Sequence, residues 1–122
     1  MAIENFEDMR VWQISQDFAV EIYQITKLFP REEQFGVTSQ IRRAASSISA
    51  NIAEGFGRRS VKDKLHFYTI AYGSLLETKN FLYLACRLQY IADDDLSRLI
   101  SHSVDCQKLI NACKHSLIEN SI

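Results

Sequence analysis

Residues that interrupt helices are scarce in this chain of 122 residues, which contains one proline and four glycines. Because these two residues disfavour helix interiors most, their scarcity leaves long stretches free to form helices. The three cysteines show no C-x-x-C spacing, which argues against a disulfide framework and a zinc knuckle. No stretch approaches the ~18 uninterrupted apolar residues of a transmembrane helix, and the N-terminal sequence MAIENFEDM lacks the basic start of a signal peptide. We therefore expect a cytoplasmic protein with no membrane partner.

The composition predicts one domain spanning residues 1–122, because hydrophobic residues make up 47% of the chain and can fill a core. A formal net charge of -1 excludes a globally basic, histone-like nucleic-acid binder. Positive charge is nevertheless concentrated locally. The segment from Arg42 to Lys64 holds six basic and two acidic residues, whereas the rest of the chain holds eight basic and thirteen acidic residues. The hypothesis of a local polyanion-binding patch therefore stays open.

Apolar residues recur every three to four positions along most of the sequence, which is the spacing of amphipathic helices. They predict four helices, over about residues 8–29, 38–56, 61–91 and 94–119. Pro30 would end the first helix, and Thr38 or Ser39 would cap the second. Ser60, followed by Asp63 three residues later, resembles a capping box that opens the third. Short connections favour an all-α fold, an antiparallel up-down-up-down four-helix bundle.

The second helix has two faces suited to packing. Ile41, Ile48 and Ile52 lie on the stripe that faces a core, while the opposite side carries small side chains in place of long charged ones. The third helix is apolar nearly all round, and two such helices exceed what one bundle interior buries. We therefore expect a homo-oligomer; the alternative is a monomer with unusually apolar central helices. The candidate interface residues are Arg43, Ser46, Ser47, Ala50, Ala53, Glu54, Phe67, Ala71, Ser74 and Phe81.

Two charged residues border the small side chains of the second helix. Arg43 and Glu54 lie three turns apart, ~16 Å along the axis, so they do not meet within one chain. If both lie in a subunit interface, each needs a partner on the neighbouring chain, because an unpaired buried charge is costly. The alternative is that both are solvated at the edge of the bundle. Glu54 also has the spacing to pair with Arg58 if the helix persists that far.

Basic residues near the second and third helices form a candidate polyanion-binding surface. In an oligomer this surface is repeated in every subunit, so weak phosphate contacts add up. Two plainer interpretations are ordinary solubility and, for Arg58 and Arg59, capping of the carbonyl end of the second helix. The candidate nucleic-acid-binding residues are Arg42, Arg43, Arg58, Arg59, Lys62 and Lys64.

The sequence shows no set of residues typical of catalysis. No Ser/His/Asp or Cys/His order suggests a triad, so we expect no enzyme activity, no catalytic residue and no cofactor. His102 and Cys106 have the spacing of two corners of a zinc site, but a third and a fourth ligand are not evident. Because unpaired cysteines are usually buried, we expect Cys106 and Cys113 to be structural and predict no metal site.

Five short motifs resemble those of the 23S rRNA intervening sequence protein family. They occur in order and at matching spacing, and the resemblance covers about Phe6 to Tyr90. The motifs are V-W-Q at Val11–Gln13, L-F-P at Leu28–Pro30, F-G-V-T-S-Q-I-R-R-A-A at Phe35–Ala45, A-N-I-A-E-G at Ala50–Gly55 and I-A-Y-G-S-L at Ile70–Leu75. The block from Q-I-R-R-A-A to A-N-I-A-E-G is highly specific, whereas the last helix is generic.

This resemblance implies a small four-helix bundle that assembles into a pentameric ring, and some members of the family are encoded inside insertions in 23S rRNA genes. Related proteins are accessory subunits of diversity-generating retroelements, in which a basic pentameric barrel contacts a reverse transcriptase and nucleic acid. The implied partners are therefore further copies of the chain, RNA or DNA, and a reverse transcriptase or other nucleic-acid enzyme. The alternative function is a purely protein-binding oligomeric scaffold, in which the arginines organise the subunit interface.

Overall fold

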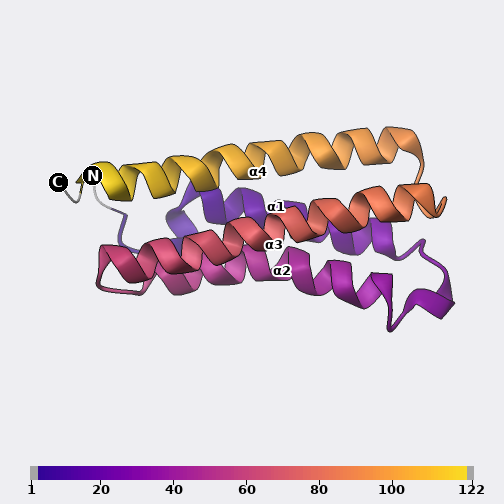
Figure 1. Cartoon of the computed structure of the whole chain (residues 1–122), viewed down its shortest axis with the longest axis horizontal. Coiled ribbons are helices and arrows are strands. Elements are labelled where there is room, and N and C mark those ends of the chain that lie inside the picture. The colour runs from indigo at the N-terminus through magenta and orange to yellow at the C-terminus, as the bar shows by residue number, and fades with distance from the viewer. Residues whose placement is uncertain (1–2, 121–122) are drawn as a thin grey trace.

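The computed structural model describes residues 3–120, and within that range it contains four long helices, two short 3-10 helices and no strand. The prediction of an all-α chain with four long helices is confirmed. Every helix in this range is too short or too polar to span a bilayer. In chain order the elements are η1 (Phe6–Asp8), α1 (Arg10–Thr26), η2 (Arg31–Glu33), α2 (Val37–Phe56), α3 (Val61–Arg87) and α4 (Asp93–Asn120) (Figure 1).

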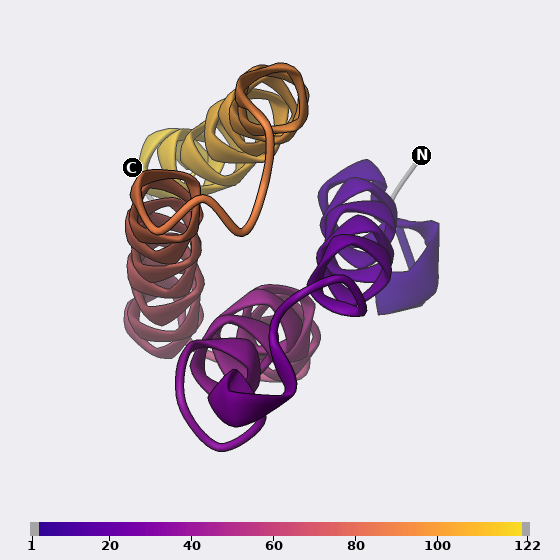
Figure 2. The ribbon, with the colours of Figure 1, turned by 90° about the vertical axis from the view of Figure 1, so that its right-hand side faces the viewer.

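The four long helices run along the long axis of the molecule, and successive helices are joined at alternate ends (Figure 1). Seen end on, they surround a shared interior (Figure 2). Burial of a large apolar side chain contributes roughly 1.5–3 kcal/mol, so this interior is the main source of stability. The large apolar side chains less than 2% exposed there are Phe18 and Ile22 of α1, Ile41, Ile48 and Ile52 of α2, Leu75 and Leu82 of α3, and Leu99 and Ile110 of α4.

α1 is shorter than the helix predicted over residues 8–29 and ends at Thr26. The backbone N–H groups of the next three residues donate to carbonyl oxygens three residues back, at 3.1 to 3.3 Å, so the chain tightens into a turn before the proline. Phe29 still packs in the core, with its ring centroid 5.5 Å from that of Tyr90. The turn therefore closes one end of the bundle without extending the helix.

The start of α2 contradicts the prediction that Thr38 or Ser39 caps it. α2 begins at Val37, and the Val37 N–H donates to Glu33 Oε1 at 3.3 Å, while the N-cap position belongs to Gly36, which has no side chain to offer. Thr38 and Ser39 lie inside the first turn, where Ser39 Oγ donates to the Gly36 carbonyl at 3.1 Å. A carboxylate from the preceding 3-10 helix, η2, thus replaces the predicted cap.

α3 ends at Arg87, whereas the sequence predicted a helix to about residue 91. The Tyr90 N–H donates to the Ala85 carbonyl at 2.8 Å and the Gln89 N–H to the Cys86 carbonyl at 2.9 Å, which are the two bonds of a Schellman motif. Gln89 adopts the left-handed conformation, with a φ of 67°, at the position that glycine usually takes. Because glutamine stands there, the sequence carries no mark of this helix end.

Replacing Gln89 by glycine should raise the free energy of unfolding by about 1 kcal/mol, because glycine has no Cβ to clash with the backbone in the left-handed region. Urea unfolding followed by circular dichroism measures the change. Gln89→Ala keeps the Cβ and serves as the control, with an expected change below ~0.5 kcal/mol. A Gln89→Gly protein no more stable than the wild type would contradict the backbone strain inferred at this residue.

Candidate nucleic-acid interface and subunit surface

The six candidate basic residues fall into two groups on the structure. Four of them, between Arg58 and Lys64, surround the turn from α2 to α3, at the end of the molecule where α4 finishes (Figure 1). Ser60 caps α3 here as predicted, since Ser60 Oγ accepts a hydrogen bond from the Asp63 N–H at 3.0 Å. Arg42 and Arg43 lie about 20 Å away along α2. The structure therefore does not gather the six residues into one patch.

Arg42 is bound to the end of α1. Its Nε donates to Thr26 Oγ1 at 2.8 Å and its Nη2 to the Tyr23 carbonyl at 3.3 Å, while the guanidinium lies 4.9 Å from the centre of the Tyr23 ring. A cation at the carbonyl end of a helix is favoured by the helix dipole. These contacts make Arg42 a structural link between α1 and α2.

Arg43 and Glu54 both find partners within the chain. Arg43 Nη2 lies 2.6 Å from Glu77 Oε2 and ties α2 to α3, while Glu54 Oε1 accepts from Arg58 Nη2 at 3.1 Å. Neither charge therefore needs a partner from a neighbouring chain, whether or not it lies in a subunit interface. The predicted pairing of Glu54 with Arg58 is confirmed because α2 stays helical through Phe56, which brings the two side chains together.

The remaining cations at the α2–α3 turn differ in how they are held. Lys64 Nζ donates to the Phe56 carbonyl at 2.7 Å and so caps the end of α2. The Arg58 guanidinium lies 4.6 Å from the centre of the Phe67 ring. Arg59 and Lys62 are exposed, and within residues 3–120 neither side chain makes a hydrogen bond, an ion pair or a ring contact. These two cations are the ones left available to a partner.

A close approach between α2 and α3 fixes this turn. Gly55 is buried, and a Cβ built on it would lie 2.7 Å from Tyr68 Cε1 and 3.0 Å from Phe67 Cβ. Real Cβ atoms do not approach a ring carbon so closely, so glycine is required for the two helices to pack at this distance. The packing role of Gly55 became visible only with α3 in place.

The face of α2 turned away from the core carries the predicted small side chains. Ser46 and Ala50 are exposed, and Ser47 and Ala53 are half-buried. Ser46 Oγ and Ser47 Oγ both donate to the Arg43 carbonyl, at 3.1 and 2.8 Å. Because these hydroxyl groups are bonded within their own helix, the face presents a shallow surface with few unsatisfied donors.

The candidate interface residues of α3 are less exposed than those of α2 and so less suited to a subunit interface. Ala71 is fully buried in the chain's own core and therefore does not belong to an outer surface, while Phe67, Ser74 and Phe81 are half-buried. The prediction of Ala71 as an interface residue is therefore wrong. Ala71 lies seven residues before Thr78, another fully buried residue, so both are on the side of α3 that faces the core. The apolar periodicity of α3 did not show which of its sides faces the interior.

Sequence reasoning missed two apolar residues on the outer side of α3. Ile70 and Leu84 are each 39% exposed and lie seven residues before and after Glu77, on the same side of the helix. Since Glu77 is bonded to Arg43, this side of α3 borders the small residues of α2. The seven-residue spacing was the available sequence signal. We name Ser46, Ser47, Ala50, Ala53, Ile70 and Leu84 the α2–α3 outer face.

His102 and Cys106 do not meet in a common site. His102 Nδ1 lies 2.5 Å from Glu21 Oε1, and Glu21 Oε2 accepts from Arg98 Nη1 at 2.6 Å, so the imidazole takes part in a pairing between α1 and α4. Cys106 is buried with Sγ 3.8 Å from the Ile14 carbonyl, and burial raises the pKa of its thiol to about 12. Among residues 3–120, no three His, Cys, Asp or Glu side chains are grouped to hold a metal.

With four long helices around one core, the chain is a four-helix protein. A comparison of its sequence with known families assigns it to one of them. The profile of the 23S rRNA-intervening sequence proteins matches residues 7–112, so the chain belongs to this family. The structure is also similar to the crystal structure of a protein of unknown function from the S23 ribosomal protein family of Bacteroides thetaiotaomicron VPI-5482. The TM-score is 0.76 at 29% sequence identity, covering 85% of this chain and 97% of that chain. No curated protein matches the chain.

Proposed function

We propose that the chain is a non-enzymatic, antiparallel up-down-up-down bundle that assembles into a homopentameric ring and acts as an accessory factor binding RNA or another nucleic acid. The observation that carries the nucleic-acid part is the pair Arg59 and Lys62, whose exposed side chains have no partner within residues 3–120. The family name supports a link with insertions in 23S rRNA.

The α2–α3 outer face supports the ring. Its small side chains let the backbone of another helix approach closely, and Ile70 and Leu84 add exposed apolar area. Next to this face, a hollow of about 470 Å³ between α1 and α2 begins at Ser46 and is lined also by Val20 and Tyr23, which are 53% and 42% exposed. Two apolar surfaces flanking one helix favour contact with a neighbouring subunit on each side.

Repetition in a ring is what makes two cations per subunit useful. A single Arg59–Lys62 pair would bind phosphate weakly, but five copies held at fixed spacing on a ring would bind one polyanion together. The slightly acidic net charge of the chain limits contacts elsewhere, so binding should depend on this turn. A reverse transcriptase or another enzyme acting on nucleic acid is the protein partner that such a ring would serve.

Nucleic-acid binding is tested by fluorescence anisotropy with a labelled RNA hairpin at several salt concentrations. The wild type should bind at low salt, and affinity should fall steeply as salt rises. In the double variant Arg59→Ala/Lys62→Ala, the affinity should drop at least about ten-fold at low salt. The slope of log affinity against log salt concentration should shrink by about 0.7–0.9 for each phosphate that the variant no longer neutralises.

The control is a second double variant, Arg31→Ala/Arg87→Ala. It removes two exposed cations at the opposite end of the bundle and leaves the α2–α3 turn intact. This control should retain wild-type affinity. Absence of RNA binding by the wild type at low salt, or equal losses in both double variants, would contradict the assignment of binding to the turn.

A purely protein-binding ring is the second candidate function. It is favoured by the contacts of the other four cations, because Arg42, Arg43, Arg58 and Lys64 are all engaged within the chain. An intact pentamer that binds no RNA or DNA at low salt would support this function over the first.

A further inference from the structure

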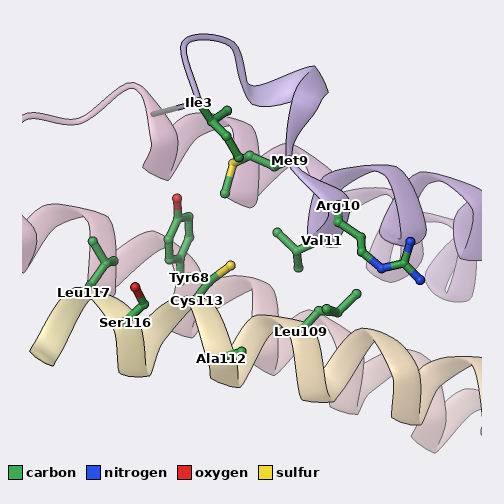
Figure 3. Close-up of a pocket in the computed structure, with 10 residues that line it drawn as sticks. All are labelled: Ile3, Met9, Arg10, Val11, Tyr68, Leu109, Ala112, Cys113, Ser116 and Leu117. Carbon is green, nitrogen blue, oxygen red and sulfur yellow. The ribbon is translucent and has the colours of Figure 1, made fainter. Parts of the chain in front are cut away.

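A hollow of about 360 Å³ opens between the start of α1, the first turns of α3 and the last turns of α4 (Figure 3). Its walls are mostly apolar, with Met9 and Val11 on one side and Leu109 and Leu117 on the other. The volume lies at the small end of the ~300–1,000 Å³ typical of ligand sites, which suits a molecule built on a single ring. The hollow is separate from Arg59 and Lys62 and plays no part in the proposed function.

The Tyr68 hydroxyl in the hollow has no protein partner among the described residues. Tyr68 is only 4% exposed, and within residues 3–120 its hydroxyl makes no hydrogen bond. Figure 3 shows this hydroxyl pointing across the hollow toward Ile3 and Met9. The hydroxyl oxygen itself is still reached by solvent, since no fully buried side-chain oxygen or nitrogen of the described residues lacks a partner, so water in the hollow can hydrate it. A ligand that displaces this water leaves the hydroxyl unpaired unless the ligand offers an acceptor. An acceptor in the hollow would supply the missing bond.

The electrostatics of the hollow favour an uncharged ligand. Burial raises the pKa of Tyr68 to about 12 and also raises the pKa of the Cys113 thiol, so both groups stay neutral at pH 7. Arg10 also lines the hollow, but Figure 3 shows its guanidinium pointing away from Tyr68 and Cys113. An anion would lose its hydration inside the hollow without meeting a cation there.

We propose that this hollow is a binding site for a small, uncharged, largely apolar molecule with one carbonyl-type acceptor, which accepts a hydrogen bond from Tyr68. The apolar walls bury the ring or chain of the molecule, and the Tyr68 hydroxyl fixes its orientation. Recognition therefore has two separable parts, the shape of the hollow and the Tyr68 hydroxyl.

Acetophenone and ethylbenzene test the donor, because the two molecules have nearly the same shape and only acetophenone has a carbonyl group. Their dissociation constants are measured by NMR titration of the full-length, assembled protein. The ratio of acetophenone to ethylbenzene affinity should be about five-fold higher in the wild type than in Tyr68→Phe, the effect of one hydrogen bond. An equal ratio in the two proteins, or no binding of either compound to the wild type, would overturn the proposal.

A second pair of variants tests the shape of the hollow independently of Tyr68. Ala112 lines the hollow on the exposed side of α4, so Ala112→Phe should fill the space and abolish binding of both compounds. Asn111→Phe adds the same side chain on the neighbouring exposed position, which does not line the hollow, and should leave binding unchanged. Wild-type affinity in Ala112→Phe would place the compounds elsewhere and contradict the site.

Alkylation of the cysteines gives a third readout. Saturating acetophenone should slow the reaction of iodoacetamide with Cys113, which lines the hollow, at least about two-fold. The rate at Cys86, at the far end of α3, should not change. Equal effects at both cysteines would mean that the compound acts on the whole protein, and this result would also overturn the proposal.

Discussion

Gly55→Ala lowers the free energy of unfolding by about 1–3 kcal/mol, because the added Cβ would overlap the Tyr68 ring. The Cβ would lie 2.7 Å from Tyr68 Cε1 and 3.0 Å from Phe67 Cβ. The Tyr68 ring can shift into the hollow that it lines, but Phe67 Cβ is fixed to the backbone of α3, so α2 and α3 must separate to relieve that contact. Urea unfolding followed by circular dichroism measures the loss, which exceeds the gain in helix propensity that alanine brings.

Gly73→Ala is the matched control for this substitution. Gly73 lies exposed in the middle of α3, and a Cβ built on it has no atom within 4 Å. Here the same change should raise the free energy of unfolding by up to about 1 kcal/mol, since alanine is the better helix former. If both variants changed stability in the same direction, the close approach at Gly55 would not be what requires glycine there.

Ala50→Arg should split the proposed ring into folded monomers. Ala50 is exposed at the centre of the α2–α3 outer face, so within one chain the new side chain extends into solvent at little cost in helix propensity. In a subunit interface the same arginine would be a buried charge without a partner, which costs about 3–5 kcal/mol at each contact. Light scattering after size exclusion measures the mass, and circular dichroism shows that the fold is retained.

Ser101→Arg is the matched control for Ala50→Arg. Ser101 is exposed on α4, which lies on the other side of the bundle from α2 (Figure 2). This variant should keep the oligomeric mass of the wild type. Equal masses for wild type, Ala50→Arg and Ser101→Arg would contradict the assignment of the α2–α3 outer face to a subunit interface.

The helices themselves were predictable because their apolar spacing is local. Ile41, Ile48 and Ile52 mark the buried side of α2 in the sequence, and all three are at most 1% exposed. The helix ends were less predictable. One is set by a side chain outside the helix, and another by a backbone conformation that the residue type does not reveal. Glu33 replaces the expected cap of α2, and Gln89 takes the place of a glycine after α3.

The candidate site was predictable only where partners are close in sequence. The Glu54–Arg58 pair follows from its spacing, whereas the bond from Arg43 to Glu77 joins residues 34 positions apart. Arg42 likewise binds α1, which no pattern around Arg42 indicates. Tertiary contacts thus reduce a basic segment of six residues to two cations available for a partner.

Measuring the oligomeric state tests the account most directly. The proposed role of the α2–α3 outer face as a subunit interface and the proposed multivalent binding by Arg59 and Lys62 both require a ring. Native mass spectrometry of the wild-type protein at micromolar concentration should show a species of five times the 14.1 kDa subunit mass. A single species at the mass of one subunit would contradict the ring and, with it, the proposed mode of nucleic-acid binding.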